Sequence, residues 1–125
     1  MVVSLAPQPQ IWYNNGMRTT KDITPPPVAV EYAQEVRNRL GPHVQQIILF
    51  GSQARGDATA RSDYDFVVVL DEFSRELRNL VSDAGADMLG RREELCAALV
   101  YDMSQWTRVC RSPLGWNIER DGVQL

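Results

Sequence analysis

The spacing of hydrophobic and polar positions predicts the order of helices and strands along the chain. After the prolines at 25–27, apolar residues four, three and four positions apart predict a helix that reaches Leu40 and ends at Gly41 and Pro42. Two nearly continuous apolar runs, 44–50 and 64–70, predict two strands. Because these runs have so few polar positions, we expect both strands to be covered on both faces.

The second half of the chain shows one clear helix and three weaker patterns. Asp71 or Ser74 can cap this helix, and Gly90 is expected to end it. Residues 95–103 form a third apolar run, which we predict as a strand. Because this run contains alanines, a helix is an alternative for its first half. A short helix can begin at 104–106, and 116–125 is expected to form short extended pieces around a turn at 121–122. The apolar stripe of the long helix consists of Phe73, Leu77, Leu80, Val81, Ala84 and Met88.

Residues 1–24 follow neither period, so we expect an N-terminal arm ahead of a single domain over 25–125. A turn signal at 14–16 interrupts this segment. Two interpretations stay open. The arm is either mobile or loosely docked, or its residues Ile11, Trp12 and Tyr13 dock on a partner or on the domain itself.

Composition and charge indicate a globular protein and argue against duplex nucleic-acid binding and a membrane span. A chain of 125 residues with 44% hydrophobic and 23% charged residues is an ordinary globular domain. A net charge of −3 gives no broad basic face for duplex nucleic acid, and no apolar run approaches the roughly 20 residues that span a bilayer. Cys96 and Cys110 lack metal-site spacing, and no secretory signal is present, so we expect reduced thiols in a soluble cytoplasmic protein.

The candidate chemistry lies between the two predicted strands. The first strand ends at Gly51 and Ser52, and the second begins with Asp63 and Asp65. Side chains alternate along a strand, so both carboxylates point the same way with their Cα atoms roughly 6.6 Å apart. Such a pair suits hard divalent cations such as Mg²⁺, and a turn with free backbone N–H groups suits phosphate. The stretch therefore predicts chemistry on a nucleotide.

Two common phosphate motifs do not explain this stretch. Gly51 and Gly56 have the glycine spacing of an ATPase loop, but Asp57 and Ala58 follow where that loop needs a lysine and a serine or threonine. An aspartate at the lysine position would repel phosphate. The dinucleotide fingerprint G-x-G-x-x-G is absent.

The remaining pattern, Gly51-Ser52-Gln53-Ala54-Arg55-Gly56-Asp57-Ala58 with Ser62-Asp63-Tyr64-Asp65, resembles the nucleotidyltransferase superfamily that includes DNA polymerase β. Within it, the chain is most similar to the minimal nucleotidyltransferases of prokaryotes. The end of the chain, 118–123, also looks like the closing segment of such proteins. The resemblance implies an α/β (α+β) fold, in which a small mixed β-sheet is packed by helices. The arm 1–24 is not covered.

The resemblance also implies roles for individual residues. Gly51 and Ser52 would hold the β- and γ-phosphates of a nucleoside triphosphate, and Ser62 would join them in nucleotide binding. Arg55 would contact phosphate or brace the turn. Asp63 and Asp65 would bind two Mg²⁺ ions. Family members carry a third catalytic and metal-binding carboxylate on a later strand, and Asp102 is the only acid of the third apolar run, with a strand-end or capping role as its alternative.

The resemblance further implies a partner. Stand-alone proteins of this kind are typically encoded beside a helical HEPN-domain protein, often an RNase toxin. We therefore expect an antitoxin that transfers AMP from ATP to a tyrosine of that toxin. The alternatives are a binding module that neutralises the toxin by complex formation alone and a transferase acting on a small molecule such as an aminoglycoside. The sequence is also compatible with a homo-oligomer.

Overall fold

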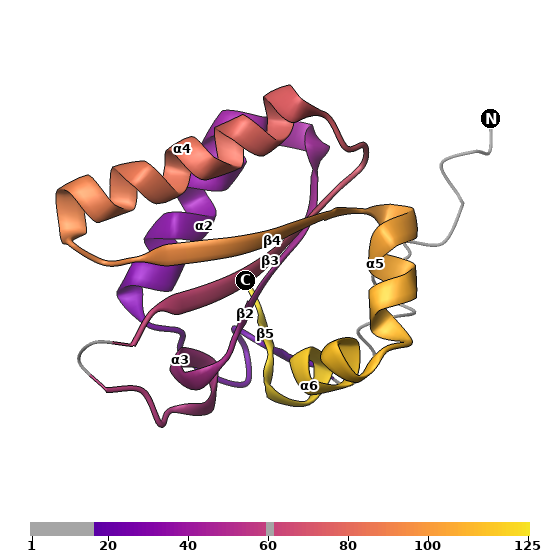
Figure 1. Cartoon of the computed structure of the whole chain (residues 1–125). Coiled ribbons are helices and arrows are strands. Elements are labelled where there is room, and N and C mark those ends of the chain that lie inside the picture. The colour runs from indigo at the N-terminus through magenta and orange to yellow at the C-terminus, as the bar shows by residue number, and fades with distance from the viewer. Residues whose placement is uncertain (1–16, 60–61) are drawn as a thin grey trace.

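Strands of mixed direction form one sheet with helices on both faces, as the computed structural model shows for residues 17–59 and 62–125 (Figure 1). The sheet order is β1-β5-β2-β3-β4. Strands β2 and β3 are antiparallel, β3 and β4 are parallel, and β5 pairs antiparallel with β2 and parallel with β1. The predicted small mixed sheet packed by helices is therefore confirmed.

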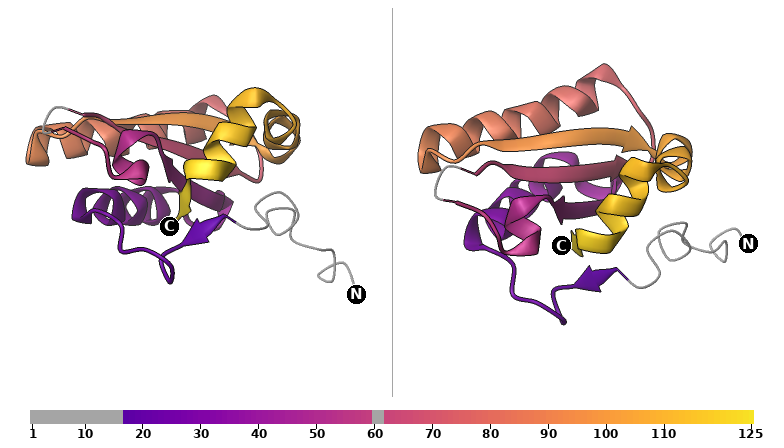
Figure 2. Two further views of the ribbon diagram at one scale, coloured as in Figure 1. Left: turned by 90° about the horizontal axis from the view of Figure 1, so that it is seen from below. Right: turned by 60° about the horizontal axis from the view of Figure 1, so that its bottom comes forward.

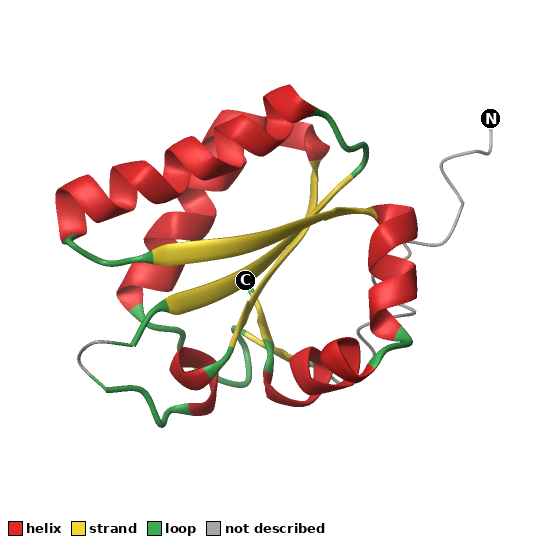
Figure 3. Cartoon of the chain, in the orientation of Figure 1, coloured by secondary structure: helices red, strands yellow, loops and turns green. Residues whose placement is uncertain are grey.

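Figure 3 distinguishes the helices from the strands by colour. The strands are β1 (Arg18–Thr19), β2 (Val44–Phe50), β3 (Tyr64–Leu70), β4 (Cys96–Asp102) and β5 (Val123–Gln124). The helices are α2 (Pro27–Leu40), the 3₁₀ turn η2 (Gly41–His43), α3 (Ser52–Arg55), α4 (Arg75–Arg92), α5 (Met103–Cys110) and α6 (Pro113–Asp121).

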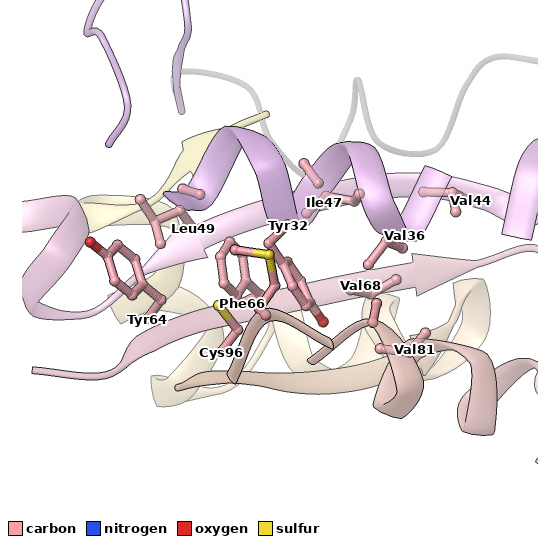
Figure 4. Packing of buried hydrophobic residues seen from close by; sticks show 14 of the residues in the cluster. Tyr32, Val36, Val44, Ile47, Leu49, Tyr64, Phe66, Val68, Val81 and Cys96 are labelled. Atoms are coloured by element: carbon pink, nitrogen blue, oxygen red, sulfur yellow. The ribbon is translucent and has the colours of Figure 1, made fainter. Parts of the chain in front are cut away.

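Each face of the sheet has its own core, because β2 and β3 are apolar on both sides. Helices α2 and α4 cover one face, where Tyr32 stacks on Phe66 with ring centroids 4.2 Å apart (Figure 4). Helices α5 and α6 cover the other face, around Val67, Trp106 and Ile118. The prediction that β2 and β3 are covered on both faces is confirmed by their nearly continuous burial.

Most predicted elements are present, and three predictions need correction. Helix α4 was expected to end at Gly90, but it continues to Arg92. The tail was predicted as extended pieces, but residues 113–121 form α6, because Pro113 occupies the first helical turn and the Ser112 hydroxyl accepts from the Gly115 amide. Only 123–124 is extended. Phe73 was assigned to the buried stripe of α4, but it precedes that helix and is 43% exposed.

Part of the predicted arm lies against the domain. Strand β1 pairs with β5 beside the C-terminal end of the chain (Figure 2), and the neighbouring Met17 is buried against Ile48 and Ile118. Ile11, Trp12 and Tyr13 lie outside the described residues.

Candidate metal and nucleotide site

The end of β2 and the start of β3 meet because these two strands are antiparallel. Phe50 pairs with Asp65 in the register, so the turn at Gly51 lies directly beside the Asp65 side chain. Gly51 has φ 78° and ψ −160°, a backbone region that is essentially reserved for glycine. A Cβ atom at position 51 would lie 2.7 Å from Asp65 Oδ2, closer than real contacts allow. The glycine thus permits both the turn and the close approach of the carboxylate.

Asp65 lies in an environment that disfavours a lone negative charge. Burial, followed by the charge of nearby Asp63, raises the pKa of Asp65 above its usual value. No ion pair to either carboxylate is formed by the described residues. Two carboxylates that repel each other and form no ion pair with the described cationic side chains suit a divalent cation, which would favour their ionised forms.

Helix α3 begins immediately after the glycine turn. Its first N–H groups, at Ser52 and Gln53, have no partner within the helix, and no side chain caps them among the described residues. The Ser52 side chain is half-buried at the same place. Gly51 and Ser52 are thus placed next to Asp65, and their role in phosphate binding stays a prediction.

A group of contacts braces α3 from its C-terminal end. Arg55 forms ion pairs with Asp57 at 3.2 Å and with Asp121 at 3.7 Å. Arg18 donates hydrogen bonds to the carbonyl oxygens of Ala54, at 3.0 Å, and Asp121. Of the two roles considered for Arg55, the structure shows bracing of the turn. Arg18 and Asp121 were not singled out from the sequence, since only the fold brings β1 and α6 to α3.

Ser62 forms hydrogen bonds that hold the loop before β3. Its hydroxyl accepts from the Thr59 amide at 2.8 Å, and its carbonyl accepts from the Gln53 side chain at 3.2 Å. The loop is thereby tied to α3. A contact from Ser62 to a nucleotide stays a prediction.

Asp102 lies far from the other two aspartates, which corrects the prediction of a three-carboxylate site. In the parallel pairing of β3 and β4, Asp65 is opposite Ala97 and Leu70 is opposite Asp102. Asp102 is thus five positions further along, roughly 16 Å at about 3.3 Å per residue. Its carboxylate instead accepts from the Gln105 amide at 2.8 Å while its own amide donates to Gln105 Oε1 at 2.9 Å. This capping box begins α5, and the hydrogen bond from Gln105 lowers the pKa of Asp102.

Ala97 occupies the position opposite Asp65, and paired residues on neighbouring strands share a face of the sheet. Over the described residues, no third histidine, cysteine or carboxylate lies with Asp63 and Asp65 in a group that could share one metal ion. Residues 1–16, 60 and 61 contain none of these residue types. The described site therefore offers two carboxylates, with an alanine where a third could stand.

A second acidic group lies at the opposite end of β2 and β3. His43 Nδ1 is 3.0 Å from Asp71 Oδ1, and Glu72 completes a trio whose ligand atoms lie within 4.8 Å of one another. The carboxylates of Asp71 and Glu72 are both exposed. We assign this trio no role.

Comparisons with known proteins agree with the geometry. Residues 30–112 match the family model of the nucleotidyltransferase domain. A search of curated proteins gave no match. Over the described part of the chain, no helix is long and apolar enough to cross a membrane.

Solved structures share the fold. A protein from Sulfolobus solfataricus, described as a candidate nucleotidyltransferase, has 26% identity and a TM-score of 0.51, covering 78% of this chain and 75% of its own. A toxin–antitoxin complex with AMP-PNP has 20% identity and a TM-score of 0.55, covering 77% and 70%. A mutant of the toxin–antitoxin MntA-HpeT has 18% identity and a TM-score of 0.54, also covering 77% and 70%.

Proposed function

Because the chain belongs to the nucleotidyltransferase domain family, we propose that it transfers AMP from ATP to a tyrosine hydroxyl of a HEPN-type RNase toxin and so acts as an antitoxin. The observation that carries this proposal is the Asp65 carboxylate lying against the Gly51 turn, since a carboxylate that could bind a metal ion then lies beside a glycine turn that could bind phosphate. Two structural neighbours are toxin–antitoxin complexes, and one of them contains the ATP analogue AMP-PNP.

The residues present fit Mg²⁺ and ATP. Oxygen donors from Asp63 and Asp65 are the ligands that Mg²⁺ prefers. Burial and the charge of Asp63 raise the pKa of Asp65, and a bound cation would favour the ionised form of this carboxylate. Asp63 and Asp65 would hold two Mg²⁺ ions, while Gly51 and Ser52 would bind the β- and γ-phosphates. Bound Mg²⁺ would neutralise charge on the phosphates and favour the ionised acceptor hydroxyl.

The reaction needs little covalent chemistry from the protein. The tyrosine oxygen forms a bond to the α-phosphorus of ATP, the bond from that phosphorus to the bridging oxygen breaks, and pyrophosphate leaves. The chain contributes position and charge complementarity, chiefly through Gly51, Asp63 and Asp65. With alanine at position 97, the residue of β4 opposite Asp65 cannot receive the hydroxyl proton, and in our proposal this proton passes to water.

The test uses the protein encoded by the neighbouring reading frame as acceptor. We expect incubation with ATP and Mg²⁺ to increase the intact mass of this acceptor by one AMP, located on a tyrosine by fragmentation. Addition of EDTA should abolish the increase. An acceptor whose mass stays unchanged, although the two proteins form a complex, would refute the transfer.

One observation favours a second candidate function. Because no third carboxylate joins Asp63 and Asp65 among the described residues, the chain could instead neutralise its partner by binding alone. The two functions are separated by a variant with both aspartates changed to asparagine. Neutralisation by this folded variant, equal to that of the parent protein, would identify the binding module.

Ala97→Asp is expected to raise the transfer rate by about a hundredfold, the scale of general-base assistance. The new carboxylate would share the face of Asp65 on the adjacent strand, about 4.8 Å away between backbones. Leu99→Asp is the matched control, because position 99 lies on the same face of β4 but two residues further along and is 39% exposed. Initial rates at saturating ATP measure the effect. Equal rates for the parent and the folded Ala97→Asp protein would show that no proton acceptor is missing.

A further inference from the structure

We propose that the outer edge of β4 binds an extended segment of a partner protein as an additional strand, with an acidic side chain of that segment paired to Arg78. β4 is the last strand of the sheet and pairs only with β3 among the described residues. This proposal concerns a surface distinct from the nucleotide site, and its test has no catalytic readout.

The backbone of β4 directs alternate residues toward the open edge. The Tyr64 amide donates to the Leu95 carbonyl at 2.9 Å, so residues 95, 97, 99 and 101 direct their backbone groups toward β3. The N–H and C=O groups of Ala98 and Val100 therefore face outward. The outward amide of Asp102 is already bonded to Gln105, which ends the open stretch.

The open edge is hollowed, and it is not blocked as exposed edges usually are. Two adjoining cavities, each of about 320 Å³, lie along it, and Arg78, Ala98 and Val100 line both. Strand β4 contains no proline, lysine or arginine, the residues that commonly protect an edge from pairing. A strand with free backbone groups beside a groove is the geometry of strand addition.

Apolar side chains border the same groove. Seven large hydrophobic residues are exposed over the described part of the chain, and four of them line these two cavities. They are Phe73, Leu89, Leu95 and Leu99. Alternate side chains of an added strand would meet them. At the base of the first cavity, the buried Tyr32 hydroxyl has no hydrogen-bond partner among the described residues.

The positive charge of Arg78 favours an acidic partner segment at the edge of β4. Arg78 forms no side-chain hydrogen bond or ion pair with any described residue, although Arg91 and Arg92 of the same helix pair with acids. A second copy that paired with β4 about its middle would bring two Arg78 side chains together, and like charges there are unfavourable. A partner segment with an acidic residue would instead complete a charge-assisted hydrogen bond.

The test is a selection of randomised decapeptides displayed on phage against the full chain. We expect enriched peptides to alternate apolar residues and to carry an aspartate or glutamate. Binding of a synthetic enriched peptide should fall at least about tenfold for Arg78→Glu, and a lysine in place of its acid should restore binding to that variant. Arg75→Glu is the matched control, because Arg75 is an exposed residue of α4 outside both cavities.

Hydrogen exchange provides the backbone readout. The amides of Ala98 and Val100 should exchange rapidly in the free protein and become protected when the peptide is bound. Ala98→Pro should also abolish binding, since it removes an outward N–H that β3 does not use. Three results would overturn the proposal: no enrichment, peptides that bind Arg78→Glu and the parent equally, or a homodimer whose contact protects these two amides.

Discussion

Replacing Asp65 with asparagine is expected to lower the rate of AMP transfer by at least about a thousandfold. A metal ion supplies several kcal/mol of transition-state stabilisation, and each 1.36 kcal/mol corresponds to a factor of ten. The introduced asparagine would keep the shape of the side chain but would lose the charge that holds the cation. The initial rate of AMP incorporation into the partner measures the loss.

Asp102→Asn is the matched control for this variant. It makes the same chemical change at the far end of β4, and asparagine caps helices about as well as aspartate does. We expect it to keep full activity. A folded Asp65→Asn protein with more than a tenth of the parent rate would contradict the role of Asp65, and an inactive Asp102→Asn protein would contradict its assignment as a cap.

The same Asp65→Asn variant should unfold at a higher temperature than the parent in metal-free buffer. The pKa of Asp65 is raised in the folded state, so ionising this carboxylate costs stability, and the cost is present above its folded pKa. The difference between the two proteins should shrink as the pH falls through that pKa. Adding Mg²⁺ should stabilise the parent and leave the variant unchanged.

Replacing Gly51 with alanine is expected to have the second largest effect, a loss of about a hundredfold in transfer rate and of about 1–3 kcal/mol in the free energy of unfolding. Alanine at position 51 would have to adopt backbone angles that it avoids. Its Cβ atom would lie 2.7 Å from Asp65 Oδ2 and would push the carboxylate away. Chemical denaturation and initial rates measure the two losses.

Gly56→Ala separates these two causes. Gly56 also has a positive φ, 86°, but a Cβ there would meet no atom within 4 Å. Gly56→Ala should therefore cost only backbone strain, about 1–2 kcal/mol, and should keep its activity. If both alanine variants were equally active, the close contact between Gly51 and Asp65 would not matter for the reaction.

The sequence predicted that the turn at Gly51 and the two aspartates lie together, because these features are local. A strand that ends in Gly51 and a strand that begins with Asp63 and Asp65 need only alternation and a hairpin-like pairing to meet. The buried strands were likewise visible as continuous apolar runs. Such short-range signals carry through to the structure with few changes.

The third carboxylate could not be predicted because its position depends on strand register. Asp102 was the only acid in its apolar run, but composition does not say which residue of β4 lies opposite Asp65. The sequence did contain a signal for the capping alternative, since Asp102 is followed three residues later by Gln105. The pairing of Asp65 with Ala97 became visible only in the assembled sheet.

Contacts between segments that are distant in the chain could not be predicted from the sequence either. Arg18 reaches α3 across 36 positions of the chain and the end of α6 across 103 positions, and no local pattern marks it. Helix α6 was misjudged for a different reason, since the Ser112-Pro113 start signal was present but the tail was interpreted from its later turn. Strand-edge features such as the groove beside β4 follow from topology alone.

The most direct test of the central claim is the location of the divalent cation, measured by paramagnetic broadening of backbone amide resonances with Mn²⁺ and AMP-PNP. We expect the strongest broadening at Gly51, Ser52, Asp65 and Ala97, and much weaker broadening at Asp102. The broadening should disappear in the Asp65→Asn protein. Broadening centred on His43 and Asp71, or broadening at Gly51 that persists in that variant, would contradict a metal-dependent nucleotide site at these aspartates.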